Sequence, residues 1–240
     1  MKNLIFHNEE FESEVRNELL IYDRPITEED ALLVYDLDCS NFTFDIEDCE
    51  TLCSFKNLDW LSINIGFEDF SFLQRLEFLE ELSLEFYRKT FDVSLLAPLK
   101  NLRSLFISGG DLSNFRFVNT DAFAKLTSLK DLTLHEFGYA DLSFLKEMPY
   151  LEGFYCGYAI EVSNIDSIAS LGNMDSLTLI DIDIKSLAFL DTLKDDMLLD
   201  LLGINVTEDY DIERLKRFRE VDVSETIING MAVNMAKYEE

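Results

Sequence analysis

Apolar residues recur along the chain in a rhythm that neither one helix nor one strand would produce. Six-residue stretches of the form L-x-x-L-x-L, with other apolar residues at some Leu positions, return every 21 to 27 residues. Their first residues are Leu32, Leu58, Leu79, Leu102, Leu129, Leu151, Met174 and Phe218, and one further unit begins at Asp196. In that unit we expect Leu199 and Leu201 to point inward, because the other register would bury Asp200 without a partner. A period near 22 residues over nine units predicts a solenoid.

A second apolar signature follows each hexamer after a variable stretch. It has the form D-x-x-x-L-x-x-L/M and occurs as "DFSFLQRL" from Asp69, "DVSLLAPL" from Asp92, "DLSFLKEM" from Asp141 and "DIKSLAFL" from Asp183. The next hexamer usually begins three residues after the last Leu or Met. Each unit therefore predicts one coil, with a strand in the hexamer and a short helical or extended outer segment in the second signature.

These repeats resemble the leucine-rich repeat family, especially its bacterial, internalin-like kind with short repeats. The resemblance covers residues 32 to 224 and implies an α/β solenoid, a horseshoe of about nine coils with a parallel sheet on its concave face. One feature departs from the family. The family usually places Asn three residues past the hexamer, whereas this chain has Ser40, Gly66, Tyr87, Gly110, Phe137, Ala159, Ile182, Ile204 and Thr226 there. The turns between coils must be held by other groups.

The ends of a solenoid need covers, because terminal coils expose apolar faces. Phe11, Val15 and Leu19 are spaced one helical turn apart, and Asn8 precedes them as an N-cap. Thr27 is a second N-cap candidate, with Asp30 three residues later in place of the usual Glu. Residues 1–31 thus predict an N-terminal helical cap, in which Phe6 and Phe11 could plug the first coil. Residues 225–240 predict a C-terminal cover or tail.

Strand alternation assigns the remaining hexamer positions to the concave face, namely the third, the fifth and the residue after the hexamer. In the first unit these are Val34, Asp36 and Asp38. Aromatic residues reach this face at Trp60, Phe106 and Tyr155, and the acidic residues Glu81, Glu85 and Asp131 surround Phe106. His135 also faces this side, and no Lys or Arg does. The loops that follow add Phe86, Tyr87, Phe137, Tyr139 and Tyr158, which either extend the patch or pack coil against coil.

Two interpretations of these aromatic residues stay open. Exposed rings beside carboxylates suit a partner that presents Arg or Lys together with apolar surface. Alternatively, small neighbours let the rings fold over and shield the sheet.

The chain is strongly acidic, with 48 Asp and Glu against 20 Lys and Arg and a net charge of −28. Such a surface repels nucleic acid and anionic membranes and favours basic partners, although the charge could serve solubility alone. No signal peptide pattern or apolar span is present, so we expect a cytoplasmic, bacterial protein. Its cysteines, Cys39, Cys49, Cys53 and Cys156, should then stay reduced, and their spacing is typical of neither a zinc site nor a redox site.

Catalytic patterns are absent from the sequence. Ser108 is expected between Glu85 and His135, whereas a triad needs the His between nucleophile and acid. Asp36 and Asp38 could hold a divalent cation only loosely. We expect no enzyme activity, no cofactor and no metal.

The sequence therefore predicts a non-catalytic protein–protein interaction module that binds a basic protein partner on its concave face. One alternative is an immunity or inhibitor protein that neutralises a cationic toxin or nuclease. Another is a structural scaffold or homo-oligomer, since the sequence leaves the oligomeric state open. The candidate partner-binding residues are Trp60, Glu81, Glu85, Phe106, Asp131, His135 and Tyr155.

Overall fold

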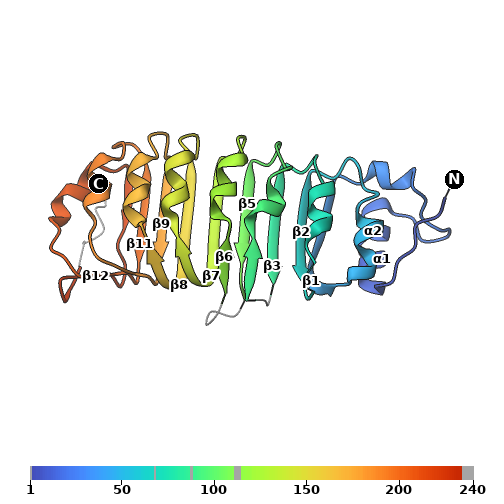
Figure 1. Ribbon diagram of the computed structural model, residues 1–240, viewed down its shortest axis with the longest axis horizontal. Helices are drawn as coiled ribbons and strands as arrows, with labels where there is room; N and C mark the ends of the chain where they lie inside the picture. Colours follow the sequence, from blue (N-terminus) through green and yellow to red (C-terminus); the bar gives the residue numbers. More distant parts are fainter. Residues whose placement is uncertain (1, 68, 87–88, 111–114, 234–240) are drawn as a thin grey trace.

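The computed structural model describes residues 2–67, 69–86, 89–110 and 115–233, and its coils stack along one axis from the N-terminal to the C-terminal end (Figure 1). In this described part, nine parallel strands follow one another in one long sheet. They are β1 (Asp36–Phe44), β2 (Trp60–Ile65), β3 (Glu81–Phe86), β5 (Ser104–Ser108), β7 (Asp131–Asp141), β8 (Gly153–Ser163), β9 (Ser176–Ile180), β11 (Leu198–Leu202) and β13 (Glu220–Asp222). The solenoid predicted from the repeat is confirmed.

Short 3-10 helices form the layer opposite the sheet. They are η3 (Ser71–Arg75), η4 (Val93–Leu96), η5 (Thr120–Lys125), η6 (Leu142–Glu147), η7 (Ile165–Ser170), η8 (Ala188–Thr192) and η9 (Ile212–Arg217). The Asp of the second signature initiates several of them. Asp92 and Asp141 accept hydrogen bonds from the backbone N–H of Ser94 and Ser143, at 2.9 and 2.8 Å. Part of the acidic composition therefore serves to cap the outer helices.

Shorter ladders join the coils beyond the main strands. β4 (Thr90–Asp92) pairs with β6 (Arg116–Val118). β6 also pairs with β7, where Arg116 lies opposite Tyr139. At the C-terminal end β10 (Asp183–Ile184), β12 (Asn205–Val206), β14 (Ile227–Ile228) and β15 (Met231–Ala232) form a second sheet. Its last pair is antiparallel, so the chain turns back and β15 forms the last strand of the small sheet. The predicted C-terminal cover or tail, residues 225–240, includes this hairpin, and residues 234–240 lie outside the described part.

The N-terminal cap contains α1 (Glu9–Leu19), η1 (Asp30–Leu33), η2 (Ile46–Asp48) and α2 (Cys49–Leu52). Asn8 caps α1 as predicted, because its side chain accepts the N–H of Phe11 at 2.9 Å. The ring centroids of Phe6 and Phe11 lie 5.2 Å apart, and those of Phe11 and Phe44 of the first coil lie 4.9 Å apart. No helix in the described residues is long and apolar enough to span a membrane.

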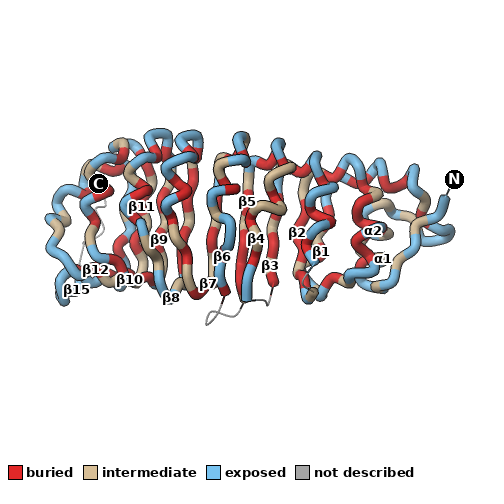
Figure 2. The backbone as a smooth tube through the Cα atoms, viewed as in Figure 1, coloured by how far each residue is buried: buried red, intermediate tan, exposed pale blue. Residues whose placement is uncertain are grey.

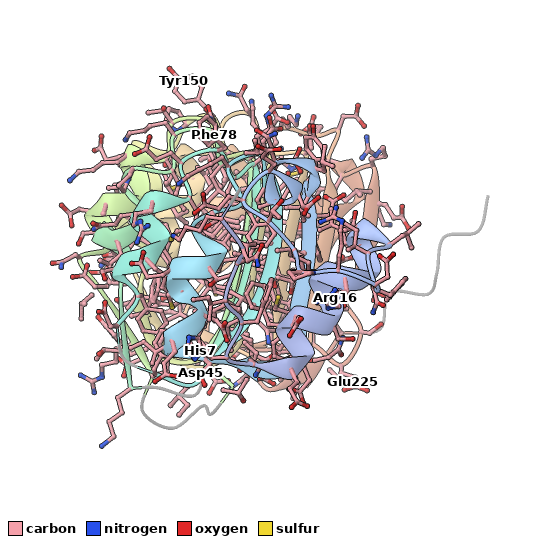
Figure 3. The ribbon with its side chains drawn as sticks, turned by 90° about the vertical axis from the view of Figure 1, so that its right-hand side faces the viewer. His7, Arg16, Asp45, Phe78, Tyr150 and Glu225 are labelled. Carbon is pink, nitrogen blue, oxygen red and sulfur yellow. The ribbon has the colours of Figure 1, made fainter. Side chains whose placement is uncertain are left out.

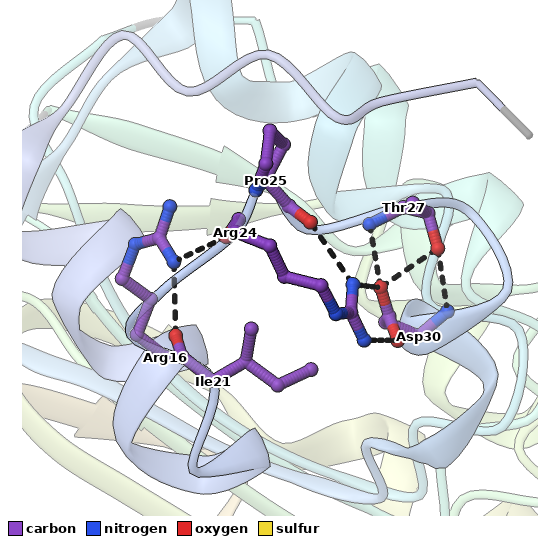
Figure 4. A network of polar contacts seen from close by, with 6 residues as sticks. All are labelled: Arg16, Ile21, Arg24, Pro25, Thr27 and Asp30. Atoms are coloured by element: carbon purple, nitrogen blue, oxygen red, sulfur yellow. Dashed lines mark hydrogen bonds and ion pairs between the residues drawn. The ribbon is translucent and has the colours of Figure 1, made fainter.

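A second capping pattern closes the segment between α1 and η1. The backbone N–H of Thr27 donates to Asp30 Oδ2 at 2.8 Å, and the N–H of Asp30 donates back to Thr27 Oγ1 at 3.3 Å. In Figure 4 the Arg24 guanidinium group donates two hydrogen bonds to the same carboxylate, while Arg16 donates to the carbonyl oxygens of Ile21 and Arg24. The reciprocal hydrogen bonds expected between Thr27 and Asp30 are present, but η1 itself begins at Asp30, so Glu29 and not Thr27 occupies its N-cap position.

The core runs the whole length of the solenoid between the two layers (Figure 2). Leucines of the hexamers are almost fully buried, for example Leu82, Leu105 and Leu132 at 1–2% exposure. Phenylalanine side chains add a continuous aromatic column from Phe70 through Phe86 and Phe115 to Phe137. Because neighbouring coils supply successive rings, this column ties each coil to the next.

The first coil differs from its predicted register by two residues. Asp36 pairs with Trp60 and Asp38 with Ser62, so the first inward residues are Val34, Leu37 and Cys39, at 0–1% exposure. The prediction that Val34 faces solvent and that Leu32 and Tyr35 face the core is wrong. The stretch "LLVYDLDC" fits both registers, and the helical turn of η1 places Leu32 and Leu33 in the cap. A shift between Cys39 and Thr43 then brings Thr43 beside Asn64.

Left-handed backbone turns lie one residue before the position at which the family usually has Asn. The second residue after the hexamer has positive φ in Glu136, Tyr158, Asp181, Gly203 and Glu225, between 47° and 64°. The following side chain then turns into the core, as in Phe137, Ile182 and Ile204. Backbone bonds link these turns, from Asn205 N–H to Ile182 O and from Ile227 N–H to Ile204 O. Apolar packing and backbone pairing thus replace the missing amide side chains.

Candidate functional site

The solvent side of the long sheet, called the sheet face below, consists of three rows of residues that run across the strands. Strand pairing places Asp36, Trp60, Glu81, Ser104, Asp131, Gly153, Ser176, Leu198 and Glu220 in the first row. The second row contains Asp38, Ser62, Ser83, Phe106, Thr133, Tyr155, Thr178, Asp200 and Asp222. The third contains Thr43, Asn64, Glu85, Ser108, His135, Gly157, Ile180 and Leu202. All seven predicted site residues therefore share one face.

Four ring side chains on and beside this face form a contiguous group, called the aromatic cluster below: Phe106, His135, Tyr155 and Tyr158. His135 lies at its centre. Its ring stacks on Phe106 at 5.9 Å and 29°, and lies at 5.9 Å and 37° from Tyr155. Tyr158 meets the same ring edge-on, at 5.0 Å and 68°. The cluster spans β5, β7 and β8 and remains partly open to solvent.

Trp60 lies on the same face but outside this cluster. It sits on β2 in the first row, two strands away from Phe106 on β5. Two strand spacings correspond to roughly 10 Å. The three aromatic residues were predicted as one patch. In the structure Phe106 and Tyr155 belong to the aromatic cluster, whereas Trp60 is a separate, partly exposed ring.

Small residues beneath the rings support part of the shielding interpretation. A β-carbon at Gly157 would lie 3.0 Å from Tyr155 Oη and 3.1 Å from its Cε1, so the Tyr155 ring lies down over this glycine. Burial, followed by the charges of neighbouring groups that include Tyr158 and Asp181, raises the pKa of Tyr155 to about 12. The ring of Tyr155 therefore covers part of the sheet at Gly157, whereas Tyr158 is 39% exposed.

Carboxylates on and beside the sheet face repel one another. The pKa of Asp131 is raised, first by loss of water around its carboxylate, which rests over Gly153, and then by the charge of Glu152. Burial and the charges of Asp222 and Glu220 likewise raise the pKa of Asp200, although Thr178 donates to it at 3.2 Å. A nearby cation would stabilise the charged form of these carboxylates.

Basic side chains lie outside the three rows, in the described residues as in the sequence. Several stand one position before the first row, where they pair with acidic residues of the neighbouring coil. Lys130 contacts Glu152 at 2.5 Å, and Arg103 contacts Glu80 at 3.4 Å. Others, such as Arg214 with Asp191 at 2.7 Å, pair within the outer layer. The cations of the chain therefore neutralise its edges and leave the sheet face negative.

Ser108 and His135 approach each other without forming a catalytic relay. Ser108 Oγ lies 3.4 Å from His135 Nδ1, and Glu136 Oε2 lies 4.0 Å from the same nitrogen. A relay needs the nucleophile on one ring nitrogen and the acid on the other. Ser108 is also only 4% exposed. This constellation does not match hydrolytic chemistry.

The loop aromatic residues divide between the two predicted roles. Phe86 and Phe137 are fully buried and pack coil against coil, whereas Tyr158 extends the patch. Tyr139 bonds Ser163 at 3.0 Å, and Tyr87 lies outside the described residues. From the sequence, Tyr158 was named as a residue that could extend the patch, but neither Tyr158 nor Glu136 was placed among the site residues. Their left-handed turns bring them against His135, and no residue type in "HEFGYA" or "CGYAI" signals such a turn.

Comparison with known proteins establishes the class of fold. No protein-family model matches the sequence, and neither does any curated protein. Among solved structures, internalin C2 of Listeria monocytogenes is similar over 90% of this chain and 93% of its own, with a TM-score of 0.70 and 21% identity. The internalin InlF of the same organism covers 93% of this chain and 77% of its own, with a TM-score of 0.54 and 18% identity. A leucine-rich repeat protein of Leptospira interrogans matches 80% of this chain and 49% of its own, at 0.60 and 20%.

The fold and the repeat together define a leucine-rich repeat solenoid. Within that class its architecture is internalin-like, with a helical cap in front of a long parallel sheet.

Proposed function

We propose that the sheet face binds a basic protein partner. The observation that carries this proposal is the composition of its three rows in the described chain. They combine partly exposed rings with carboxylates such as Glu81 and Asp131, and they contain no Lys or Arg. Burial, followed by the charge of Glu152, raises the pKa of Asp131, and a cation brought by the partner would stabilise this carboxylate in its charged form.

Substitution of the rings tests the apolar part of the interface. Once a partner has been isolated from the native cell, Phe106→Ala and Trp60→Ala should each weaken its binding by about tenfold or more, as buried aromatic anchors do. Phe78→Ala and Tyr150→Ala serve as matched controls, since these exposed rings project from the edge where β3 and β8 begin (Figure 3). Unchanged affinity in both sheet-face variants would refute the assignment of the site.

Charge removal tests the electrostatic part. Glu81→Gln should slow association and reduce its dependence on salt, because the carboxylate attracts the partner before contact. Glu147→Gln removes an exposed charge from the outer helix η6 instead and should have a smaller effect. Binding whose affinity is the same at low salt and at about 0.5 M salt would contradict recognition led by charge.

The net charge of −28 favours one specific version of this function, an immunity or inhibitor protein that blocks a cationic toxin or nuclease. The carboxylates of the sheet face would then occupy the surface that the nuclease offers to phosphate groups. Inhibition of the isolated partner's catalytic activity at one-to-one stoichiometry would support this version. Binding without inhibition would leave a simple interaction module.

Self-association is the competing use of the same face. Light scattering at several protein concentrations separates the two, because a homo-oligomer built through the sheet face would increase in mass with concentration. A constant monomer mass supports a free binding face.

A further inference from the structure

We infer that the aromatic cluster is the subsite that receives an arginine side chain of the basic partner. This inference rests on the proposed function and narrows it from a basic surface to one residue type at one place. The cluster comprises Phe106, His135, Tyr155 and Tyr158, with the carboxylate of Glu136 beside it.

The rings present a corner rather than a flat surface. The planes of Phe106 and Tyr155 are inclined by 29° and 37° to the ring of His135, which lies between them on β7. Tyr158 stands at 68° to His135 and forms a wall at the end of the sheet face. A planar group that enters this corner can stack on one ring, and the edge of the planar group then points away from the sheet.

Negative charge lies next to this corner. Glu136 Oε2 is 3.5 Å from Ser108 Oγ and 4.0 Å from His135 Nδ1, so its carboxylate sits at the rim of the cluster. Asp181, in the turn after β9, carries a second charge whose field reaches Tyr155. No Lys or Arg of the described sheet-face rows competes for these carboxylates.

A guanidinium group fits these surroundings better than an ammonium group. It is planar and weakly hydrated, so it stacks on an aromatic face and still donates N–H groups in its plane to a carboxylate. An ammonium group is strongly hydrated and would lose more water on entering the half-buried cluster, where the His135 side chain is only 25% exposed. We therefore expect arginine to be preferred over lysine.

The resonances of the two histidines provide a direct test of this inference. The chain contains only His7 and His135, so protein labelled at histidine gives one resonance in the cluster and one in the N-terminal cap. A hexa-arginine peptide and a hexa-lysine peptide, titrated at equal ionic strength, are the probes. The arginine peptide should shift the His135 resonance at a concentration about fivefold lower than the lysine peptide, and the His7 resonance should stay in place.

Ring removal then separates stacking from general attraction. Phe106→Leu retains apolar volume, and Tyr158→Asn suits the left-handed turn at φ 54° while removing the ring. Each should weaken binding of the arginine peptide by about fivefold and leave the lysine peptide almost unchanged. Tyr150→Ala, at the edge of the solenoid, is the control and should alter neither.

The outcomes distinguish this inference from the proposed function. If both peptides shift His135 equally and salt weakens both equally, the arginine subsite is wrong and the basic-partner face stands. If the ring variants weaken both peptides to the same extent, the subsite is likewise wrong. If neither peptide moves the His135 resonance or the fluorescence of Trp60, the only tryptophan, both proposals fail.

Discussion

Arg24 holds Asp30 by two hydrogen bonds of 2.7 Å, one from each terminal nitrogen of the guanidinium group, within the N-terminal cap. Asp30 also accepts from the backbone and hydroxyl of Thr27, and it is only 8% exposed. The Arg24 guanidinium therefore holds the pKa of this carboxyl well below its usual range, with help from Thr27. One side chain thus connects the segment after α1 to the helical turn that precedes the first strand.

Removal of this carboxylate should loosen the cap. We expect Asp30→Ala to lower the free energy of unfolding by about 2 kcal/mol, since several hydrogen bonds to a charged group are lost together. Glu29→Ala, next to it and exposed, is the matched control and should change stability by less than about 0.5 kcal/mol. Urea unfolding followed by circular dichroism measures both. Equal losses in the two variants would contradict a specific role of Asp30.

Stability should be greatest at mildly acidic pH. Burial, with acidic neighbours, raises the pKa of Asp48, Asp59, Asp131 and Asp200 above the ordinary value of 3.8. In the pH range between their ordinary and their raised pKa values the folded protein binds more protons, so stability falls as pH rises through this range. Hydrogen bonds lower the pKa of Asp30, Asp69, Asp92 and Asp141, and their contribution is lost as pH falls below 3.8.

Thermal unfolding at constant ionic strength tests this dependence. The midpoint should be highest at about pH 4, should fall as pH rises above that value, and should fall again below about pH 3. Added salt should raise the midpoint at pH 8 more than at pH 5, because it screens carboxylate repulsion. A midpoint that increases steadily from pH 5 to pH 8 would refute the raised pKa values.

The left-handed turn at Glu225 offers a stabilising substitution. Its φ of 60° costs a residue with a β-carbon about 1 kcal/mol, and glycine avoids that cost. Glu225→Gly should therefore raise the unfolding free energy by up to about 1 kcal/mol. Glu225→Ala removes the same charge but keeps the β-carbon, so it should bring no such gain. If alanine stabilises as much as glycine, loss of negative charge is the cause instead of backbone relief.

The four cysteines should be chemically silent in the folded protein. Cys39, Cys53 and Cys156 are 0–2% exposed and Cys49 is 9% exposed, and all four are free thiols. Burial raises the pKa of Cys49 and Cys156 to about 12 and also that of Cys39 and Cys53. Because the thiolate is the reactive form, a thiol reagent such as dithiobis-nitrobenzoate should label the native protein very slowly at pH 8.

Unfolding supplies the control for this measurement. In concentrated guanidinium chloride all four thiols should react at once. Rapid labelling of one thiol in the native protein would show that its coil opens locally without global unfolding.

Local sequence determined the repeating architecture. Each hexamer specifies its own inward leucines, and the register around Asp196 followed because Leu199 and Leu201 fill the core while Asp200 reaches solvent. A solenoid is built from contacts between neighbouring coils, so its fold is encoded unit by unit. The N-cap at Asn8 and the reciprocal bonds between Thr27 and Asp30 were predictable for the same reason, since each depends on residues within three positions.

Only the tertiary structure decided the details that depend on contacts between distant residues. "LLVYDLDC" permits two registers, and the pairing of Asp36 with Trp60 selects the one in which Val34 is buried. The composition of the aromatic cluster was decided in the same way. Tyr158 joins His135 through a left-handed backbone turn, whereas Trp60 stays apart on β2 because strand β3 lies between it and Phe106 on β5. Side-chain alternation places a residue on a face, but the contacts it makes there depend on strand order and backbone turns between coils.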